Sequence, residues 1–263
     1  GEGAEGGEGA EGGEGSEGGE GSEGGEGAEG GEGAEGGEGA EGGEGSEGGE
    51  GAEGGEGWMP GDSASFVTPL PMYEGELSDG EQANADFVDQ LMGEALLDEL
   101  QDGGHVIYIR HAQTERDFAD QVTADVKDFS TQRVVSEFGV QQSLAIGEGF
   151  DLADIPYDEV ITSDYGRAIT TAAIAFGQYE KNSALNFLPF EDYTDEQVEE
   201  MRANVMPFLT DVPDAGTNTI IVGHDDLFEA GTGIYPDPQG IAYVLTPDGM
   251  GEFDIVANLL PEE

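Results

Sequence analysis

The chain has 263 residues, with 60 Asp and Glu against 7 Lys and Arg, and its formal net charge at pH 7 is −53. So large a negative charge argues against nucleic acid and anionic membrane surfaces as partners, because both carry negative charge themselves. The absence of cysteine excludes disulfides and thiolate chemistry, and no apolar run approaches the roughly 18 residues of a membrane span.

Residues 1–57 contain only Gly, Glu, Ala and Ser, arranged in a repeating triplet x-Glu-Gly in which x alternates between Gly and Ala or Ser. This Gly- and Glu-rich tail has too little apolar surface to offset the entropy of ordering, so we expect a flexible, acidic, low-complexity spacer. The alternative is an ordered rod with three residues per turn. Such rods would join copies of the chain into a homo-oligomer or polymer once salt or a divalent cation screened the Glu side chains.

The composition divides the chain into three parts. The repeat tail at 1–57 precedes a linker at 58–80 that contains three Pro, and the remaining 81–263 are enough for one domain with a sizeable core. Outside the tail there remain 41 Asp and Glu against 7 Lys and Arg. This acidity favours a saline setting, where charges are screened beyond about 8 Å. Because the chain also starts with Gly rather than Met, we expect a secreted or extracellular protein.

Helices are predicted where apolar residues recur at helical spacing. The first covers 81–102, where Phe87, Leu91 and Leu100 follow this spacing and Gly103-Gly104 ends the helix. Another begins at Thr194, which forms a capping-box pattern with Gln197. The helices and their expected apolar faces are 137–150 with Val140, Leu144, Gly147 and Phe150; 166–177; and 195–209 with Val198, Met201, Arg202, Val205 and Leu209.

Strands are predicted where short runs are rich in apolar and β-branched residues. The last two are separated by Pro247-Asp248-Gly249, a strong turn signal. His105, just before the first strand, is interpreted as a solvated loop residue, and the acidic run 196–200 as a solvated helix face. The predicted strands are 106–109, 157–163, 184–190, 218–223, 241–246 and 252–259.

Strands that alternate with helices predict an α/β fold, a three-layer sandwich with a mainly parallel central sheet flanked by helices. In such sheets, ligands bind at the carboxyl ends of the strands. Arg110 and His111 end the first long strand, and Ser163 ends the second, with Arg167 four residues further on. His224 ends the third. Four of the eight Arg and His residues therefore map to one edge of the sheet.

Two Arg and two His at one edge predict a site for an oxyanion. Arg presents a planar fork of donors that suits phosphate and keeps its charge. A neutral His is a nucleophile toward phosphorus. Phosphoryl transfer depends mostly on positioning and on neutralising charge, so these groups predict a reaction that needs neither a metal ion nor another cofactor.

Four segments resemble, in the same order, motifs of the histidine phosphatase superfamily, and in particular its phosphoglycerate mutase-like branch. VIYIRHAQTE, at 106–115, is similar to the Arg-His-Gly-x-Thr signature, with Ala112 where Gly is more usual. DFSTQRVVSEFGVQQSLAIGEGF, at 128–150, resembles the segment that leads into the first long helix. VITSDYGRAITTAAIAFG, at 160–177, and TIIVGHDDLFEAGTG, at 219–233, are similar to the Ser-x-x-x-Arg-Ala motif and to the second-histidine strand.

The resemblance implies a phosphoglycerate mutase-like fold after the low-complexity tail, and it assigns roles to individual residues. His111 would become phosphorylated, while Arg110, Arg167 and His224 would hold the phosphoryl oxygens. Thr114 would lie in the signature loop. Arg133 would supply a further contact to the substrate.

The residue that protonates the leaving group has two candidates. Mutase-like members use a Glu in the insertion after the second helix, which corresponds to Glu191 or Asp192. Acid-phosphatase-like members use an Asp directly after the second His, which corresponds to Asp225. Both alternatives stay open, and the short mutase-like architecture favours Glu191.

The sequence therefore predicts a metal-independent phosphomonoester hydrolase that acts on a small phosphorylated substrate through a phosphohistidine intermediate. A phosphatase is favoured over a mutase, because a mutase holds a doubly phosphorylated intermediate and few further basic residues remain. The alternative is a structural or assembly subunit that forms filaments, built from an inactive phosphatase-like domain and the Gly-rich tail.

Overall fold

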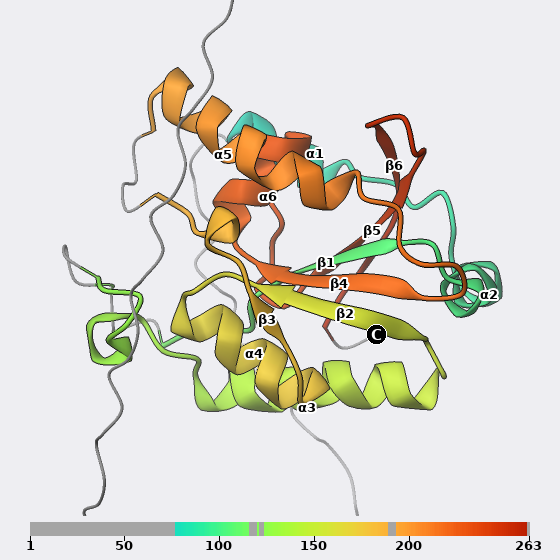
Figure 1. The fold of residues 1–263 in the computed structure, drawn as a ribbon, viewed down its shortest axis with the longest axis horizontal. Helices are drawn as coiled ribbons and strands as arrows, with labels where there is room; N and C mark the ends of the chain where they lie inside the picture. Colours follow the sequence, from blue (N-terminus) through green and yellow to red (C-terminus); the bar gives the residue numbers. More distant parts are fainter. Residues whose placement is uncertain (1–76, 116–119, 121–123, 189–192, 262–263) are drawn as a thin grey trace, which may run out of the picture. The chain divides into compact units, whose positions relative to one another are not determined.

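A computed structural model describes residues 77–115, 120, 124–188 and 193–261. In this part of the chain, six strands form one sheet in the order β3-β2-β4-β1-β5-β6 (Figure 1). Neighbours among the first four strands run parallel, whereas β5 and β6 are antiparallel to their neighbours. The strands are β1 Val106–Arg110, β2 Tyr157–Thr162, β3 Glu180–Lys181, β4 Asn218–Gly223, β5 Ala242–Pro247 and β6 Phe253–Leu259.

Helices cover both faces of this sheet, so the predicted three-layer α/β fold is confirmed. In Figure 1, α3 and α4 lie below the strands, and α1, α5 and α6 lie above them. None of the described helices is long and apolar enough to cross a membrane. The helices are α1 Asp79–Ala85, α2 Glu94–Asp102, α3 Glu137–Leu152, α4 Gly166–Phe176, α5 Asp195–Leu209 and α6 Asp225–Thr232, with short 3-10 turns at Phe129–Thr131 and Ser183–Leu185.

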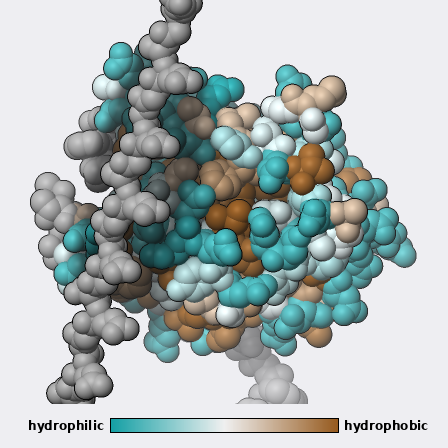
Figure 2. All heavy atoms as spheres, in the orientation of Figure 1, coloured by the Kyte–Doolittle hydropathy of each residue, from teal (hydrophilic) through white to brown (hydrophobic). Residues whose placement is uncertain are grey.

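Strand β1 lies inside the sheet and is covered on both faces, so all five of its residues are buried, including Arg110 at its end. Ile107 and Ile109 belong to the core formed with α2, α3 and α4. Val106 and Tyr108 point to the opposite core, formed with α5 and α6. The exterior is hydrophilic over most of the face in Figure 2, as the acidic composition requires.

Local sequence signals position several helix ends as predicted. The capping box of Thr194 and Gln197 opens α5, and three of the five residues expected on its apolar face are buried, namely Met201, Val205 and Leu209. The other two, Val198 and Arg202, are exposed, whereas the acidic run 196–200 lies on the outside as expected.

The single helix predicted over 81–102 is wrong, because the structure has two helices separated by 86–93. Phe87 packs into the core under α5 and α6, whereas Leu91 packs against the opposite core. Between them, the backbone N–H groups of Gln90 and Leu91 donate to Val256 O of β6. The chain therefore passes around the edge of the sheet at this point. A single straight helix cannot make that passage. The second helix, α2, begins directly after Gly93, whose φ is 58°.

Three smaller predictions are also corrected. No strand forms in the described part of the range 184–190, which begins inside the 3-10 turn Ser183–Leu185. The short edge strand is Glu180–Lys181 instead. Residues 189–190 lie outside the described part of the chain. Leu144 of α3 is exposed, because small and polar residues of that helix face the core. His105 is buried rather than solvated, since the pairing of β1 with β5 brings its Nδ1 to 3.0 Å from Thr246 Oγ1.

The tail at 1–57 and most of the linker at 58–80 lie outside the described residues, so the expectations about them stay predictions. Helix α1 begins at Asp79, inside the range expected for the linker. Ser78 caps it, because its hydroxyl accepts from Glu81 N while the Glu81 carboxylate accepts from Ser78 N. The capping box makes this helix start locally encoded.

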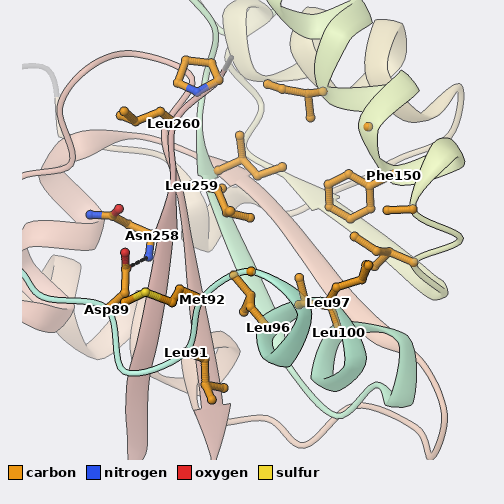
Figure 3. A pocket seen from close by; sticks show the side chains of 18 of the residues that line it. Asp89, Leu91, Met92, Leu96, Leu97, Leu100, Phe150, Asn258, Leu259 and Leu260 are labelled. Atoms are coloured by element: carbon orange, nitrogen blue, oxygen red, sulfur yellow. Dashed lines mark hydrogen bonds between the residues drawn. The ribbon is translucent and has the colours of Figure 1, made fainter. Parts of the chain in front are cut away.

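A cavity of about 410 Å³ lies between α2, α3 and the end of β6 (Figure 3). Leu96, Leu100 and Phe150 line it with other apolar side chains. At its rim, Asn258 N donates to Asp89 Oδ1 over 2.8 Å. Gly149 lines the same cavity from α3, and a Cβ added there would meet no atom within 4 Å.

Helix α3 offers a matched pair of Gly substitutions. Gly149→Ala should raise the free energy of unfolding by about 0.5–1 kcal/mol, because Ala lowers the entropy cost of the helix and its methyl group enters free space. Gly147→Ala should lower it by about 1–3 kcal/mol, because the new Cβ would lie 2.1 Å from Ala175 O of α4. Urea unfolding measures both, and stabilisation by Gly147→Ala would contradict the packing of α3 on α4.

Candidate active site

The carboxyl ends of β1, β2 and β4 meet at one edge of the sheet. Arg110 and Gly223 are paired at the end of the β1–β4 ladder, and His111 N donates to Gly223 O over 3.0 Å. His111 and His224 each follow their strand, and their ring centroids are 5.4 Å apart. Ser163, after β2, places its Oγ 2.7 Å from His224 Nε2. The predicted gathering of strand ends is therefore confirmed.

His111 has the geometry of a nucleophile. Its Nδ1 lies 2.9 Å from Ala112 O. A carbonyl oxygen only accepts, so Nδ1 carries the proton and Nε2 keeps its lone pair. Burial, followed by the charges of Arg167 and Arg110, lowers the pKa of His111 to about 3. The imidazole is therefore neutral at pH 7, which is the form that attacks phosphorus.

The loop after His111 is held by side chains from other elements. Ala112 is fully buried, so the methyl group that replaces the more usual Gly is accommodated. Thr114 is also buried, and its Oγ1 accepts from Gln239 Nε2 over 3.3 Å, so it anchors the loop. Three successive backbone N–H groups each donate to a side chain: Ala112 to Thr171 Oγ1, Gln113 to Gln142 Oε1 and Thr114 to Gln239 Oε1.

Arg110 is buried and bound mainly by acceptors from the α6 side of the sheet. Its Nη2 donates to Asp225 Oδ2 over 2.5 Å, and its Nη1 donates to Pro236 O over 2.7 Å and to Asp237 Oδ1 over 3.0 Å. Asp225 Oδ2 also accepts from Tyr235 OH over 2.8 Å. Although burial acts to raise it, Arg110 holds the pKa of Asp225 below its ordinary value. Asp225 is thus ionised and fixes the guanidinium.

Arg167 projects from the first turn of α4 and is also buried. Its Nη1 donates to Asp120 Oδ1 over 3.1 Å, and the same oxygen accepts from Arg133 N over 2.6 Å. The guanidinium carbon lies 4.8 Å from the ring centroid of Phe187 and 5.1 Å from that of Tyr165. Asp120 therefore connects two Arg residues that the sequence placed far apart, and two rings fix the plane of one of them.

Several buried nitrogen atoms of these residues have no hydrogen-bond partner among the described residues. They are the Nε atoms of Arg110, Arg133 and Arg167, and His224 Nδ1. Burial, and then the charge of Arg167, holds the pKa of His224 well below its usual range, so this imidazole is also neutral at pH 7. An unpartnered buried donor costs about 1–3 kcal/mol, so the site favours an anion with several acceptor oxygens.

The structure brings together most of the residues predicted for the site. Arg110, His111, Arg167 and His224 meet as expected, and Arg133 joins them through Asp120, which accepts from Arg133 N and from Arg167 Nη1. Thr114 and Asp225 occupy anchoring positions. Glu191 and its neighbour Asp192 lie outside the described residues. The sequence patterns did not single out Tyr108, which lies in the segment 106–115 but outside its signature residues, nor Asp120 and Tyr235, which lie in no motif.

Comparisons with known proteins give fold-level likenesses. No protein-family model matches the chain, and no curated protein matches it. Similar solved structures include the protein histidine phosphatase SixA complexed with tungstate, with 16% identity, 60% of this chain and 97% of that chain covered, and a TM-score of 0.44. Another is a phosphoserine phosphatase from Entamoeba histolytica in complex with 3-phosphoglyceric acid. It has 13% identity and a TM-score of 0.44, and the match covers 60% of this chain and 99% of that chain. A mycobacterial glucosyl-3-phosphoglycerate phosphatase complexed with VO3 has 13% identity and a TM-score of 0.43, and the match covers 58% of this chain and 97% of that chain.

Arg167→Lys tests the anion site. Lys keeps the positive charge but loses the forked donors, so the affinity for inorganic phosphate should fall about tenfold or more. Calorimetric titration with inorganic phosphate measures this. Arg202→Lys, which changes an exposed Arg of α5, is the matched control and should bind as the wild type does. If Arg167→Lys binds inorganic phosphate as tightly as the wild type does, Arg167 only forms a structural ion pair with Asp120 and does not bind the anion.

Proposed function

We propose that this chain is a phosphomonoester hydrolase that acts through a phosphohistidine on His111 and requires no metal ion. One observation carries the proposal. A neutral imidazole, with its Nε2 lone pair free, lies among buried guanidinium groups whose Nε donors have no partner in the described part of the chain. A nucleophile and a set of donors for phosphoryl oxygens are thus present in one place.

In the first step, His111 Nε2 attacks phosphorus and forms an N–P bond while the ester P–O bond breaks. Arg110, Arg167 and His224 donate to the phosphoryl oxygens, where negative charge develops. Arg133 supplies a further donor, and Thr114 keeps the loop after His111 in place. The leaving oxygen takes its bonding electron pair and a proton from a carboxylic acid, and the product is an alcohol.

In the second step, water attacks phosphorus and the N–P bond breaks, so that His111 regains its lone pair. The carboxylate formed in the first step takes a proton from the attacking water. Inorganic phosphate leaves, and the enzyme returns to its starting state. No oxidant, metal ion or second substrate is required, and the substrate class is a small phosphorylated molecule.

For the proton donor we keep Glu191, with Asp225 in another role. Asp225 is ionised by its ion pair with Arg110 and by the Tyr235 hydroxyl, so at neutral pH it has no proton to give. Its neighbour Asp226 differs, since burial and then the charge of Asp225 raise its pKa to about 7. Because it also lies in the first turn of α6, two residues after His224, Asp226 joins Glu191 as a candidate acid.

The tail has no described structure, so its role as an assembly element and the secreted or extracellular location remain expectations from the sequence. A phosphatase domain displayed on a polymer would combine both of the functions considered. The buried nucleophile and donors favour an active domain over an inactive one, because an inactive scaffold gains nothing from buried nitrogens that lack a partner in the described part of the chain.

His111→Ala should abolish hydrolysis of p-nitrophenyl phosphate and also the acid-labile, base-stable phosphate that a rapid quench traps on the wild-type protein. His105→Gln is the control, because it changes another buried His, which is bonded to Thr246 rather than to the site, and it should keep both signals. Normal turnover by His111→Ala would exclude the phosphohistidine mechanism.

Three amide substitutions identify the proton donor: Glu191→Gln, Asp225→Asn and Asp226→Asn. Loss of the true acid should reduce hydrolysis of an alkyl phosphate at least about tenfold more than that of p-nitrophenyl phosphate, whose leaving group needs no proton. Asp225→Asn should slow both substrates equally, because it releases Arg110. If Asp225→Asn alone discriminates between the two substrates, Asp225 is the acid and Glu191 is not.

A further inference from the structure

The backbone of His224 lies just beyond the end of the sheet. Strand β4 ends at Gly223, helix α6 begins at Asp225, and His224 between them is extended, with φ of −123° and ψ of 156°. The Gly223 carbonyl accepts from His111 N, which is the last bond between β1 and β4. The N–H and C=O groups of His224 therefore need partners that the strand ladder does not supply.

One side chain bonds to both groups, and the C=O group also accepts from Phe228 N of α6 over 3.4 Å. Tyr108 OH accepts from His224 N over 2.9 Å and donates to His224 O over 2.7 Å. Because a hydroxyl carries one proton and two lone pairs, it can make both bonds at once. Burial raises the pKa of the Tyr108 phenol far above its ordinary value, so the hydroxyl keeps the proton that it donates.

The Tyr108 hydroxyl has little room to move. Tyr108 is fully buried, and its ring lies 4.7 Å from that of Phe228 in α6. Gly223 also lies against the phenol, since an added Cβ there would be only 2.2 Å from Tyr108 OH. The absence of a side chain at Gly223 thus lets the phenol reach the main chain of the next residue.

We propose that Tyr108 is a positioning residue that sets the catalytic geometry of His224. The phenol fixes the main chain of His224, Ser163 Oγ lies 2.7 Å from Nε2, and the ring of Phe187 lies 4.8 Å away. With backbone and imidazole both held, Nδ1 points in one direction. This inference rests on the proposed function, in which His224 donates to a phosphoryl oxygen.

Tyr108→Phe removes only the hydroxyl, and Tyr243→Phe is a matched control. Tyr243 is paired with Tyr108 across β1 and β5, is equally buried, and donates its hydroxyl to Asn84 Oδ1, away from His224. Tyr108→Phe should lower kcat on p-nitrophenyl phosphate about tenfold or more, because a misplaced donor loses transition-state contacts, while KM changes less than about threefold. Tyr243→Phe should keep kcat within about twofold.

The imidazole signals of His224 in NMR spectra give a readout independent of turnover. They should shift in Tyr108→Phe and stay in place in Tyr243→Phe. If Tyr108→Phe keeps both kcat and these signals, or if the two variants lose kcat equally, the positioning role is overturned. If the wild type hydrolyses no phosphate ester, the proposed function fails by itself, and the His224 signals alone then decide whether Tyr108 sets its position.

Discussion

The parallel pairing of β1 with β4 is the constraint on which the site depends. The two strands pair in register from Val106 opposite Thr219 to Arg110 opposite Gly223, so their carboxyl ends lie side by side. Each is followed at once by a His, and the two rings come within 5.4 Å without any contribution from a long loop. Because β1 is buried on both faces, this pairing is enforced by the two cores rather than by the site itself.

Carboxylates in the site orient the guanidinium groups without using all their donors. Asp225 and Asp237 bind the Nη atoms of Arg110, and Asp120 binds an Nη atom of Arg167, whereas the Nε atoms remain unpartnered in the described part of the chain. A chain with only five Arg has thus placed three of them in one buried site and matched them with a few of its 60 acids. These few carboxylates fix the direction of the guanidinium groups.

Local patterns predicted five of the six described strands and the edge at which β1, β2 and β4 end, because apolar periodicity and helix caps are encoded within a few residues. What the sequence did not predict depends on contacts between distant segments. The helix break at 86–93 follows from bonds to Val256 at the sheet edge, and the burial of His105 follows from its contact with Thr246. Asp120 lies in a loop with no motif. Its role becomes visible only when Arg167 and Arg133 are placed beside it.

Tyr108 shows why fold and site cannot be separated in β1. Read as a strand residue, it is simply one of five buried positions, and its ring does pack on Phe228 in the core. Successive strand residues point to opposite faces, so a shift of one residue in β1 would turn Tyr108 away from α6, and the main chain of His224 would lose both of its bonds to the phenol. The same shift would move Arg110 away from Asp225. Because side chains alternate along the strand, the register that buries Ile107 and Ile109 on one face of the sheet also places the Tyr108 phenol against His224 on the other face.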